Sequence, residues 1–189
     1  CPQRYMSLFG GGVDLNDYTG IIAPPPANPV SGSFNEGFLI GTASGQYLNQ
    51  NTRLEMEGTW RNNTGDIWIS PMGTSSPFDG RLNVFSNMVN IVREFGGDDG
   101  LGFYGGGGIG VSRQEGEFVV GATNFELGDW AFAFQGIAGV NLFADGNRRL
   151  FFEYRYFGNT ETNLVSSGAT VGNFVYDSHN YVFGIQLKK

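Results

Sequence analysis

The sequence is poor in charge, in cysteine, in histidine and in lysine. Charged residues make up 15% of the 189 residues, the net charge at pH 7 is −7, and both lysines stand at the C-terminal end. Nucleic-acid binding needs clustered Lys and Arg, so this composition excludes nucleic acid as a partner. The single cysteine, Cys1, excludes an internal disulfide framework and a cysteine metal cluster. We expect neither a metal nor a cofactor.

Long apolar runs are missing as well. A membrane-spanning helix needs about 20 consecutive apolar residues, and no run in the sequence approaches that length. This excludes helical insertion but leaves a membrane barrel open, because spanning strands give a much weaker signal per segment. Glycine, with 31 residues, and aromatic residues, at 15%, are abundant. They suit many strands with close backbone approaches, and the length predicts one domain over residues 1–189.

The sequence begins with a cysteine and not with a methionine. An exported chain whose leader has been removed begins in this way, and so does a shortened chain. A mature chain that starts at cysteine resembles a bacterial lipoprotein, in which that residue carries the lipid anchor. Cys1 is therefore a candidate lipidation site, which mass spectrometry of the N-terminal peptide would test.

Eight segments of roughly ten residues or more have the composition and alternation of β-strands. They are residues 4–14, 33–45, 51–62, 81–95, 101–113, 129–143, 148–157 and 178–188. Long separators (15–32, 63–80, 114–128 and 158–177) alternate with short turns (near 49–51, 96–100 and 144–147). The last two turns have the Gly, Asp and Asn content of tight hairpins. The pattern predicts an all-β fold: an eight-stranded antiparallel up-and-down transmembrane barrel with short periplasmic turns and four longer external loops.

The segment 148–157 has two very different faces, because side chains alternate along a strand. One face holds Leu150, Phe152, Tyr154 and Tyr156, and the other holds the charged pair Glu153 and Arg155 next to Phe151 and Phe157. The third segment repeats the pattern, with charged residues on one face and apolar residues on the other. Its charged face holds Arg53, Glu55, Glu57 and Arg61, and its apolar face holds Leu54, Met56 and Trp60.

Two barrels fit these faces. A soluble, lipocalin-like ligand-binding barrel would turn the aromatic faces inward, whereas a membrane barrel turns them to lipid and the charges to the lumen. Eight strands enclose a space only just wide enough for side chains to fill. The bulky faces therefore fit better on the outside, and we favour the membrane barrel.

Four stretches carry a resemblance to a known family. They are residues 5–13 with three consecutive glycines, 85–93 with Asn87 and Asn90, the glycine-rich 102–110, and Phe-Glu-Tyr-Arg-Tyr at 152–156. Together they resemble the eight-stranded outer-membrane barrels that include the OmpA transmembrane domain and the opacity-type surface proteins of the porin family. The resemblance implies an integral protein of the outer membrane of a Gram-negative bacterium, exposed at the cell surface. It also implies that Glu153 and Arg155 project inward.

The lumen-facing charges are the best candidate site. They are Arg53, Glu55, Glu57, Arg61, Glu153 and Arg155. An isolated charge enclosed in a barrel is costly, so these groups should pair with one another. One interpretation is a salt-bridged plug that fills the interior, to which the family resemblance points first. The other is a gate, in which an exchange of ion-pair partners opens a narrow pore.

Other candidates for chemistry are weak. His179 is the only histidine and adjoins Ser178, but adjacent strand residues point to opposite faces and cannot form a catalytic pair. Residues 96–100 lack the alternating ligands of an EF-hand and are better explained as a turn. We therefore expect no catalytic residues, and a lipid-modifying outer-membrane enzyme is a minor alternative.

The long loops carry more acidic than basic residues. An acidic rim could bind divalent cations that bridge to lipopolysaccharide phosphates, or it could simply be solvated. The expected partners are outer-membrane lipids, lipopolysaccharide, and either a second copy by lateral association or a surface partner of the long loops. The sequence thus predicts a structural or surface-presenting barrel without enzymatic activity.

Overall fold

The computed structural model describes residues 3–22, 28–69, 75–77, 79–96, 101–120, 123–145, 147–166 and 169–188. Cys1 and most of the predicted turn at 96–100 lie outside the described residues, so the lipidation of Cys1 stays a prediction. Within the described part of the chain, no helix is long and apolar enough to cross a membrane.

The regular structure consists of β-strands. In chain order they are β1 (Arg4–Leu15), β2 (Tyr18–Ile22), β3 (Asn28–Phe34), β4 (Gly37–Tyr47), β5 (Thr52–Ile69), β6 (Ser75–Pro77), β7 (Asp79–Phe95), β8 (Gly102–Val120), β9 (Thr123–Asp145), β10 (Arg148–Asn159), β11 (Thr162–Ser166), β12 (Ala169–Phe174) and β13 (Asp177–Lys188). Strands β1, β4, β5, β7, β8, β9, β10 and β13 correspond to the eight predicted segments.

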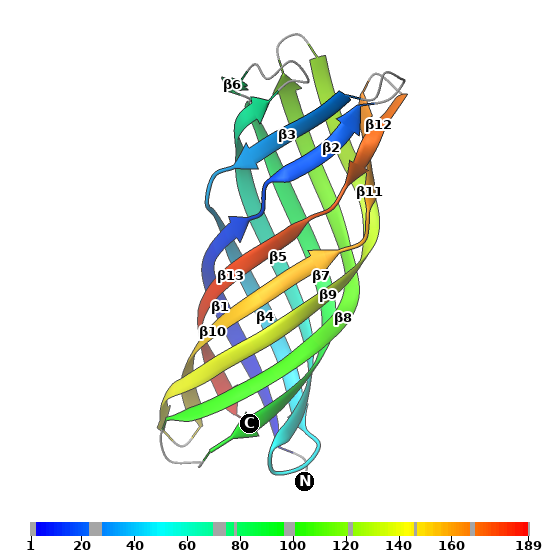
Figure 1. Cartoon of the computed structure of the whole chain (residues 1–189). Coiled ribbons are helices and arrows are strands. Elements are labelled where there is room, and N and C mark those ends of the chain that lie inside the picture. Colours follow the sequence, from blue (N-terminus) through cyan, green and yellow to red (C-terminus); the bar gives the residue numbers. More distant parts are fainter. Residues whose placement is uncertain are drawn as a thin grey trace.

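These eight strands form a closed antiparallel barrel (Figure 1). Each pairs with its neighbour in sequence, and β13 pairs with both β10 and β1, which closes the cylinder. Both chain ends lie at the end of the barrel that carries the short turns (Figure 1). The predicted eight-stranded up-and-down barrel is therefore confirmed.

The predicted long loops contain more strand than the sequence suggested. β8 and β9 remain paired up to Val120 and Thr123, so that most of the expected loop 114–128 is a hairpin. β2 pairs with β3 and β11 with β12, which adds two more hairpins at the same end. Where a strand extends past the band of outward apolar residues that would face lipid (the apolar belt), its outer face does not have to be apolar. The alternation that identifies strands in sequence is therefore weaker there.

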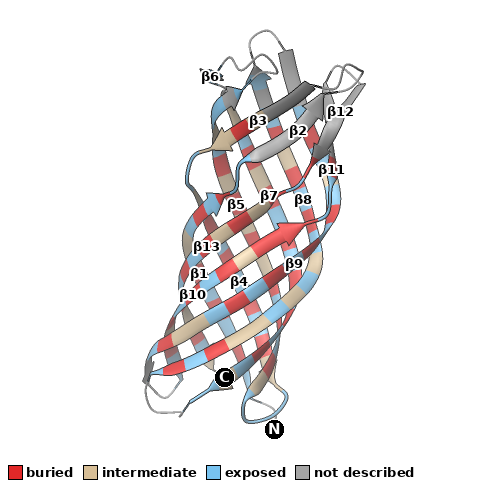
Figure 2. Ribbon diagram, viewed as in Figure 1, coloured by how far each residue is buried: buried red, intermediate tan, exposed pale blue. Residues whose placement is uncertain are grey.

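The barrel is inverted relative to a soluble protein. Burial alternates along the strands (Figure 2), and large apolar side chains lie on the outer surface. Met56 is 70% exposed, Ile109 61% and Trp130 59%. The aromatic stripes thus face outward, which is opposite to the arrangement that a soluble lipocalin-like barrel needs.

Large rings also enter the interior, on more strands than the inward Phe151 and Phe157 of the segment 148–157 indicated. Each of four inward aromatic residues lies directly opposite an inward glycine on the neighbouring strand. The pairs are Tyr5 with Gly45, Phe9 with Gly41, Tyr104 with Gly139, and Phe151 with Gly184. A Cβ atom added at any of these glycines would collide with the facing ring. The abundance of glycine is therefore partly a steric requirement of the packed interior.

Candidate functional site

The six charged residues predicted for the lumen all lie inside the barrel. Each is at most 5% exposed, and they occupy alternate inward positions of β5 and β10. These two strands are on opposite sides of the barrel, because three strands separate them in either direction around it. The inward charges of the two strands therefore face each other across the interior.

An ion pair crosses this space. Arg155 Nη1 lies 2.8 Å from Glu57 Oε1, and Arg155 Nε donates to Glu153 Oε2 at 2.6 Å. The Arg155 guanidinium also lies over the Phe9 ring, 4.3 Å from the ring centroid. One arginine therefore holds a carboxylate from each side of the barrel and packs against a ring on a third strand.

Glu57 is the most heavily bonded acid of the interior. Besides its ion pair with Arg155, it accepts hydrogen bonds from Thr59 Oγ1 and Asn90 Nδ2, both at 2.8 Å, and from Gln135 Nε2 at 3.1 Å. Gln135 also donates to Asn90 Oδ1 at 2.7 Å. Residues from β5, β7, β9 and β10 thus share one carboxylate, which satisfies a charge that would be costly if it were buried alone.

A second cluster lies toward the short-turn end of the barrel. Arg53 Nε lies 2.8 Å from Glu55 Oε1, and its Nη1 pairs with Glu94. Arg149 Nη1 lies 2.7 Å from Glu94 Oε1, to which Tyr47 also donates a hydrogen bond at 2.8 Å. Glu94 thus contacts three side chains of this cluster, much as Glu57 is the shared acceptor of the groups around Arg155.

Tyrosines connect the two clusters. Tyr104 donates to Glu153 Oε1 at 2.8 Å, and the Arg53 guanidinium lies 4.6 Å from the centroid of the Tyr104 ring. Tyr5 donates a hydrogen bond to Glu55. The charged groups of the two clusters therefore form one continuous network along the interior, which we call the lumen network. It consists of Arg53, Glu55, Glu57, Glu94, Arg149, Glu153 and Arg155 with the tyrosines bonded to them.

The sequence analysis missed Glu94 and Arg149, although a signal for each exists. Arg149 has the same parity as Glu153 and Arg155 on β10, and Glu94 has the same parity as Asn90 on β7. Glu94 lies next to the outward-facing Arg93 at the end of β7, and Arg149 lies next to the outward-facing Arg148 at the start of β10. At strand ends the alternation is too short to tell which of two adjacent charged residues points inward.

Arg61 differs from the other arginines of the site. No ion pair with a carboxylate of the described residues holds it; its Nη1 donates to Ser86 Oγ at 2.8 Å and its Nε to Asn180 Oδ1 at 3.2 Å. Its guanidinium lies 3.9 Å from the centroid of the Phe157 ring, and its Nη2 has no hydrogen-bond partner among the described residues. The expectation that every lumen charge pairs with another is therefore wrong for Arg61.

An apolar cluster fills the interior around and beyond Arg61, toward the long connections. It contains Leu15, Leu82, Val84, Met88, Leu127, Ala133, Phe157, Phe174 and Tyr176, all buried. Tyr176 donates a hydrogen bond to Asn63 at 3.2 Å. A second buried apolar cluster, which includes Phe9 and Tyr104, packs against Arg155 and Arg53 of the lumen network. Both halves of the interior therefore mix apolar side chains with buried polar groups.

Ser178 and His179 are on opposite faces of β13. Ser178 is fully buried and its Oγ accepts a hydrogen bond from Asn180 Nδ2 at 3.2 Å. His179 lies on the outer face, where its Nδ1 is 2.6 Å from the hydroxyl oxygen of Tyr154 and its ring stacks on that tyrosine. In the described part of the chain, no group of three or more His, Cys, Asp or Glu side chains could hold a metal ion.

Comparison with known proteins finds relatives by structure only. No protein-family model and no curated protein sequence matches the chain. Among solved structures it is similar to OprG of Pseudomonas aeruginosa, with a TM-score of 0.64, 11% identity, and coverage of 98% of this chain and 95% of that one. It is also similar to the outer-membrane protease OmpT of Escherichia coli (TM-score 0.58, 8% identity, coverage 99% and 97%) and to Neisserial surface protein A (0.53, 14%, 97% and 97%).

At these identities the likeness concerns the fold, and it agrees with the outward apolar surface and the closed antiparallel topology. The chain has the fold of the eight-stranded bacterial outer-membrane β-barrels.

Proposed function

We propose that the protein is an integral outer-membrane barrel that presents surface structure, is closed to solutes at rest and catalyses no reaction. The observation that carries this proposal is the ion pair between Arg155 and Glu57 across the diameter of the barrel. Such a pair connects opposite walls and occupies the middle of the lumen. On this proposal residues 1–189 act as a single barrel domain.

Two kinds of packing support a closed lumen. The lumen network, with the apolar side chains packed among it, fills the half near the short turns. The apolar cluster around Phe157 and Tyr176, with the buried polar groups bonded to Tyr176, fills the half near the long connections. An ion that entered from either end would have to displace paired charges or shed its water among apolar side chains. Both steps are costly in a space that eight strands make only just wide enough for side chains.

The long strands support a role in surface presentation. A membrane-spanning strand needs about 9–11 residues, whereas β8 has 19 and β9 has 23. These strands therefore continue well beyond the apolar belt as a paired hairpin, on the side opposite the chain ends (Figure 1). Ordered hairpins of this kind give a partner, or a second copy of the barrel, a defined surface to contact.

The absence of catalysis is proposed from the placement of the only histidine. His179 contacts Tyr154 on the outer face, while the hydroxyl of Ser178 is buried inside. A serine and a histidine separated by the wall of the barrel cannot exchange a proton.

Reconstitution into planar lipid bilayers tests the closed lumen. We expect no steady conductance from wild-type monomers, because neither half of the interior offers a water path. Arg155→Ala should also stay closed, since the apolar cluster still seals the other half. The double variant Arg155→Ala/Phe157→Ala should give small channel events. Steady, large conductance from wild-type monomers would overturn the proposal.

A further inference from the structure

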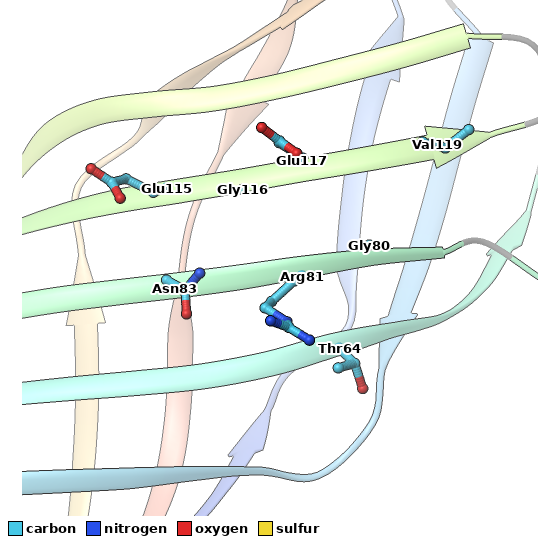
Figure 3. Close-up of a pocket in the computed structure, with 8 residues that line it drawn as sticks. All are labelled: Thr64, Gly80, Arg81, Asn83, Glu115, Gly116, Glu117 and Val119. Carbon is cyan, nitrogen blue, oxygen red and sulfur yellow. The ribbon is translucent and has the colours of Figure 1, made fainter.

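A pocket lies on the outer face of the barrel where β5 and β7 part. The two strands are paired up to Thr64 and Arg81; beyond that point β5 pairs with β6 and β3, while β7 continues beside β8. The pocket at this fork has a volume of about 530 Å³ and is lined by Thr64, Arg81, Asn83, Glu115 and Glu117 among others (Figure 3).

The charged groups that line the pocket are Arg81, Glu115 and Glu117. Arg81 and Glu117 are directly opposite in the register of β7 and β8, yet no ion pair of the described residues includes either. In Figure 3 the Arg81 side chain extends toward Thr64, away from Glu117. Glu115, by contrast, is held by Arg113 at 2.9 Å.

A further carboxylate reinforces the anionic side. Glu126 on β9 lies opposite Glu117, and both side chains are exposed. The free positive charge at Arg81 and the negative charge at Glu117 and Glu126 are therefore on neighbouring strands. A ligand that carries a phosphate and an ammonium group fits this arrangement, whereas a purely anionic ligand would be repelled by the two acids.

An apolar groove lies below the pocket, over β1, β4, β5 and β7. Its volume is about 430 Å³, and Leu8, Ile40, Trp60 and Phe85 line it. Gly58 also lines it, and a Cβ at that position would meet no atom nearer than Asn87 Oδ1 at 3.7 Å. The groove belongs to the outward apolar belt, where the occupant available in a membrane is a hydrocarbon chain.

The pocket and the groove are spaced as the two parts of one lipid are. Arg81 and Asn87 are six residues apart on β7, which is about 20 Å along a strand and about 14 Å along the membrane normal at a tilt near 45°. That depth is close to half of the roughly 25 Å apolar band of a barrel. Trp60 and Phe85, which are paired across β5 and β7, form the end of the groove nearest the pocket.

We propose that the pocket and the groove together bind a membrane lipid whose headgroup carries phosphoethanolamine. Arg81 binds the phosphate, Glu117 and Glu126 bind the ammonium group, and one acyl chain lies in the groove over Gly58. The site rests on the proposed function in one respect, namely that the apolar belt is embedded in a membrane.

Native mass spectrometry of the folded barrel in detergent tests the site. The probes are phosphatidylethanolamine, phosphatidylglycerol and phosphatidylcholine with identical chains, together with soluble phosphoethanolamine. We expect phosphatidylethanolamine to bind about tenfold more tightly than the other two lipids, because only its ammonium group donates hydrogen bonds to the carboxylates. Soluble phosphoethanolamine should not bind in the same concentration range, because it lacks the chain.

Three variants separate the parts of the site. Arg81→Gln should weaken binding of all three lipids about tenfold, Glu117→Gln should remove the preference for phosphatidylethanolamine, and Gly58→Leu should weaken all three by filling the groove. Arg93→Gln is the control for Arg81, since it is also exposed on β7 but at the other end. Gly136→Leu is the control for Gly58, since it is exposed on β9 with no atom within 4 Å of its Cβ position.

Several outcomes would overturn the site. They are equal affinity of the wild type for the three lipids, tighter binding of phosphatidylglycerol, an equal loss in a control variant, or lipid-independent dimers that Gly58→Leu abolishes. All of these leave a detergent-dependent membrane barrel intact. A chain that stays folded and monomeric in plain buffer would instead overturn the proposed function as well.

Discussion

Arg155 on β10 and Glu57 on β5 are joined at 2.8 Å although they start from opposite walls of the barrel. Each residue also has partners on its own side: Arg155 holds Glu153, and Glu57 accepts hydrogen bonds from Thr59, Asn90 and Gln135. The pair therefore acts as a cross-brace, and its contribution to stability depends on how completely the barrel excludes water from it.

The first prediction concerns the loss of this brace. Glu57→Ala should lower the free energy of unfolding by about 3 kcal/mol, because it leaves Arg155 and two amides with fewer partners in a buried site. Urea unfolding of the barrel in lipid vesicles measures the change. The matched control is Glu115→Ala on the outer surface, whose partner Arg113 is 49% exposed. There the loss should stay below about 1 kcal/mol. Equal losses in the two variants would show that water reaches the lumen pair.

The second prediction concerns the arginine that has no carboxylate. Arg61→Leu should leave the free energy of unfolding within about 1 kcal/mol of the wild-type value. The substitution removes a buried charge and leaves no carboxylate without its counter-charge. Arg155→Leu should cost about 3–5 kcal/mol, because Glu57 and Glu153 then lose their counter-charge. The same unfolding measurement compares the two variants. A larger loss for Arg61→Leu than for Arg155→Leu would contradict the assignment.

The third prediction concerns catalysis. If the protein were a lipid-modifying enzyme that uses His179, cells expressing it would contain altered lipid A, and His179→Ala would abolish the alteration. We expect unaltered lipid A in both cases, because Tyr154 holds His179 on the outer face and Ser178 is buried. Mass spectrometry of extracted lipid A decides this, and a modification that is present with the wild type and lost with the variant would refute a non-catalytic role.

The sequence alone predicts the barrel and the inward charges of β5 and β10, since alternation over seven or more residues fixes which face each side chain takes. It does not predict the contacts of Glu94, which depend on how far apart β4, β5, β7 and β10 lie across the lumen. It also does not predict that the stretch 114–128 is mostly strand, because both faces of a strand beyond the apolar belt are free of the apolar requirement. Pairing between strands is a property of register, which one strand's pattern does not contain.

The last prediction tests such a register-dependent contact. Phe9 and Gly41 are paired across β1 and β4, and a Cβ at Gly41 would lie 2.5 Å from two ring carbons of Phe9. Gly41→Ala should therefore lower the free energy of unfolding by about 1–3 kcal/mol, the usual cost of overpacking a filled interior. Gly136→Ala should have no such cost, and could stabilise the strand by up to about 1 kcal/mol, because its Cβ would meet nothing within 4 Å. Combining Gly41→Ala with Phe9→Leu should recover part of the loss, since the smaller side chain yields the space. If Gly41→Ala were as stable as Gly136→Ala, the opposed ring could not be what requires glycine at that position.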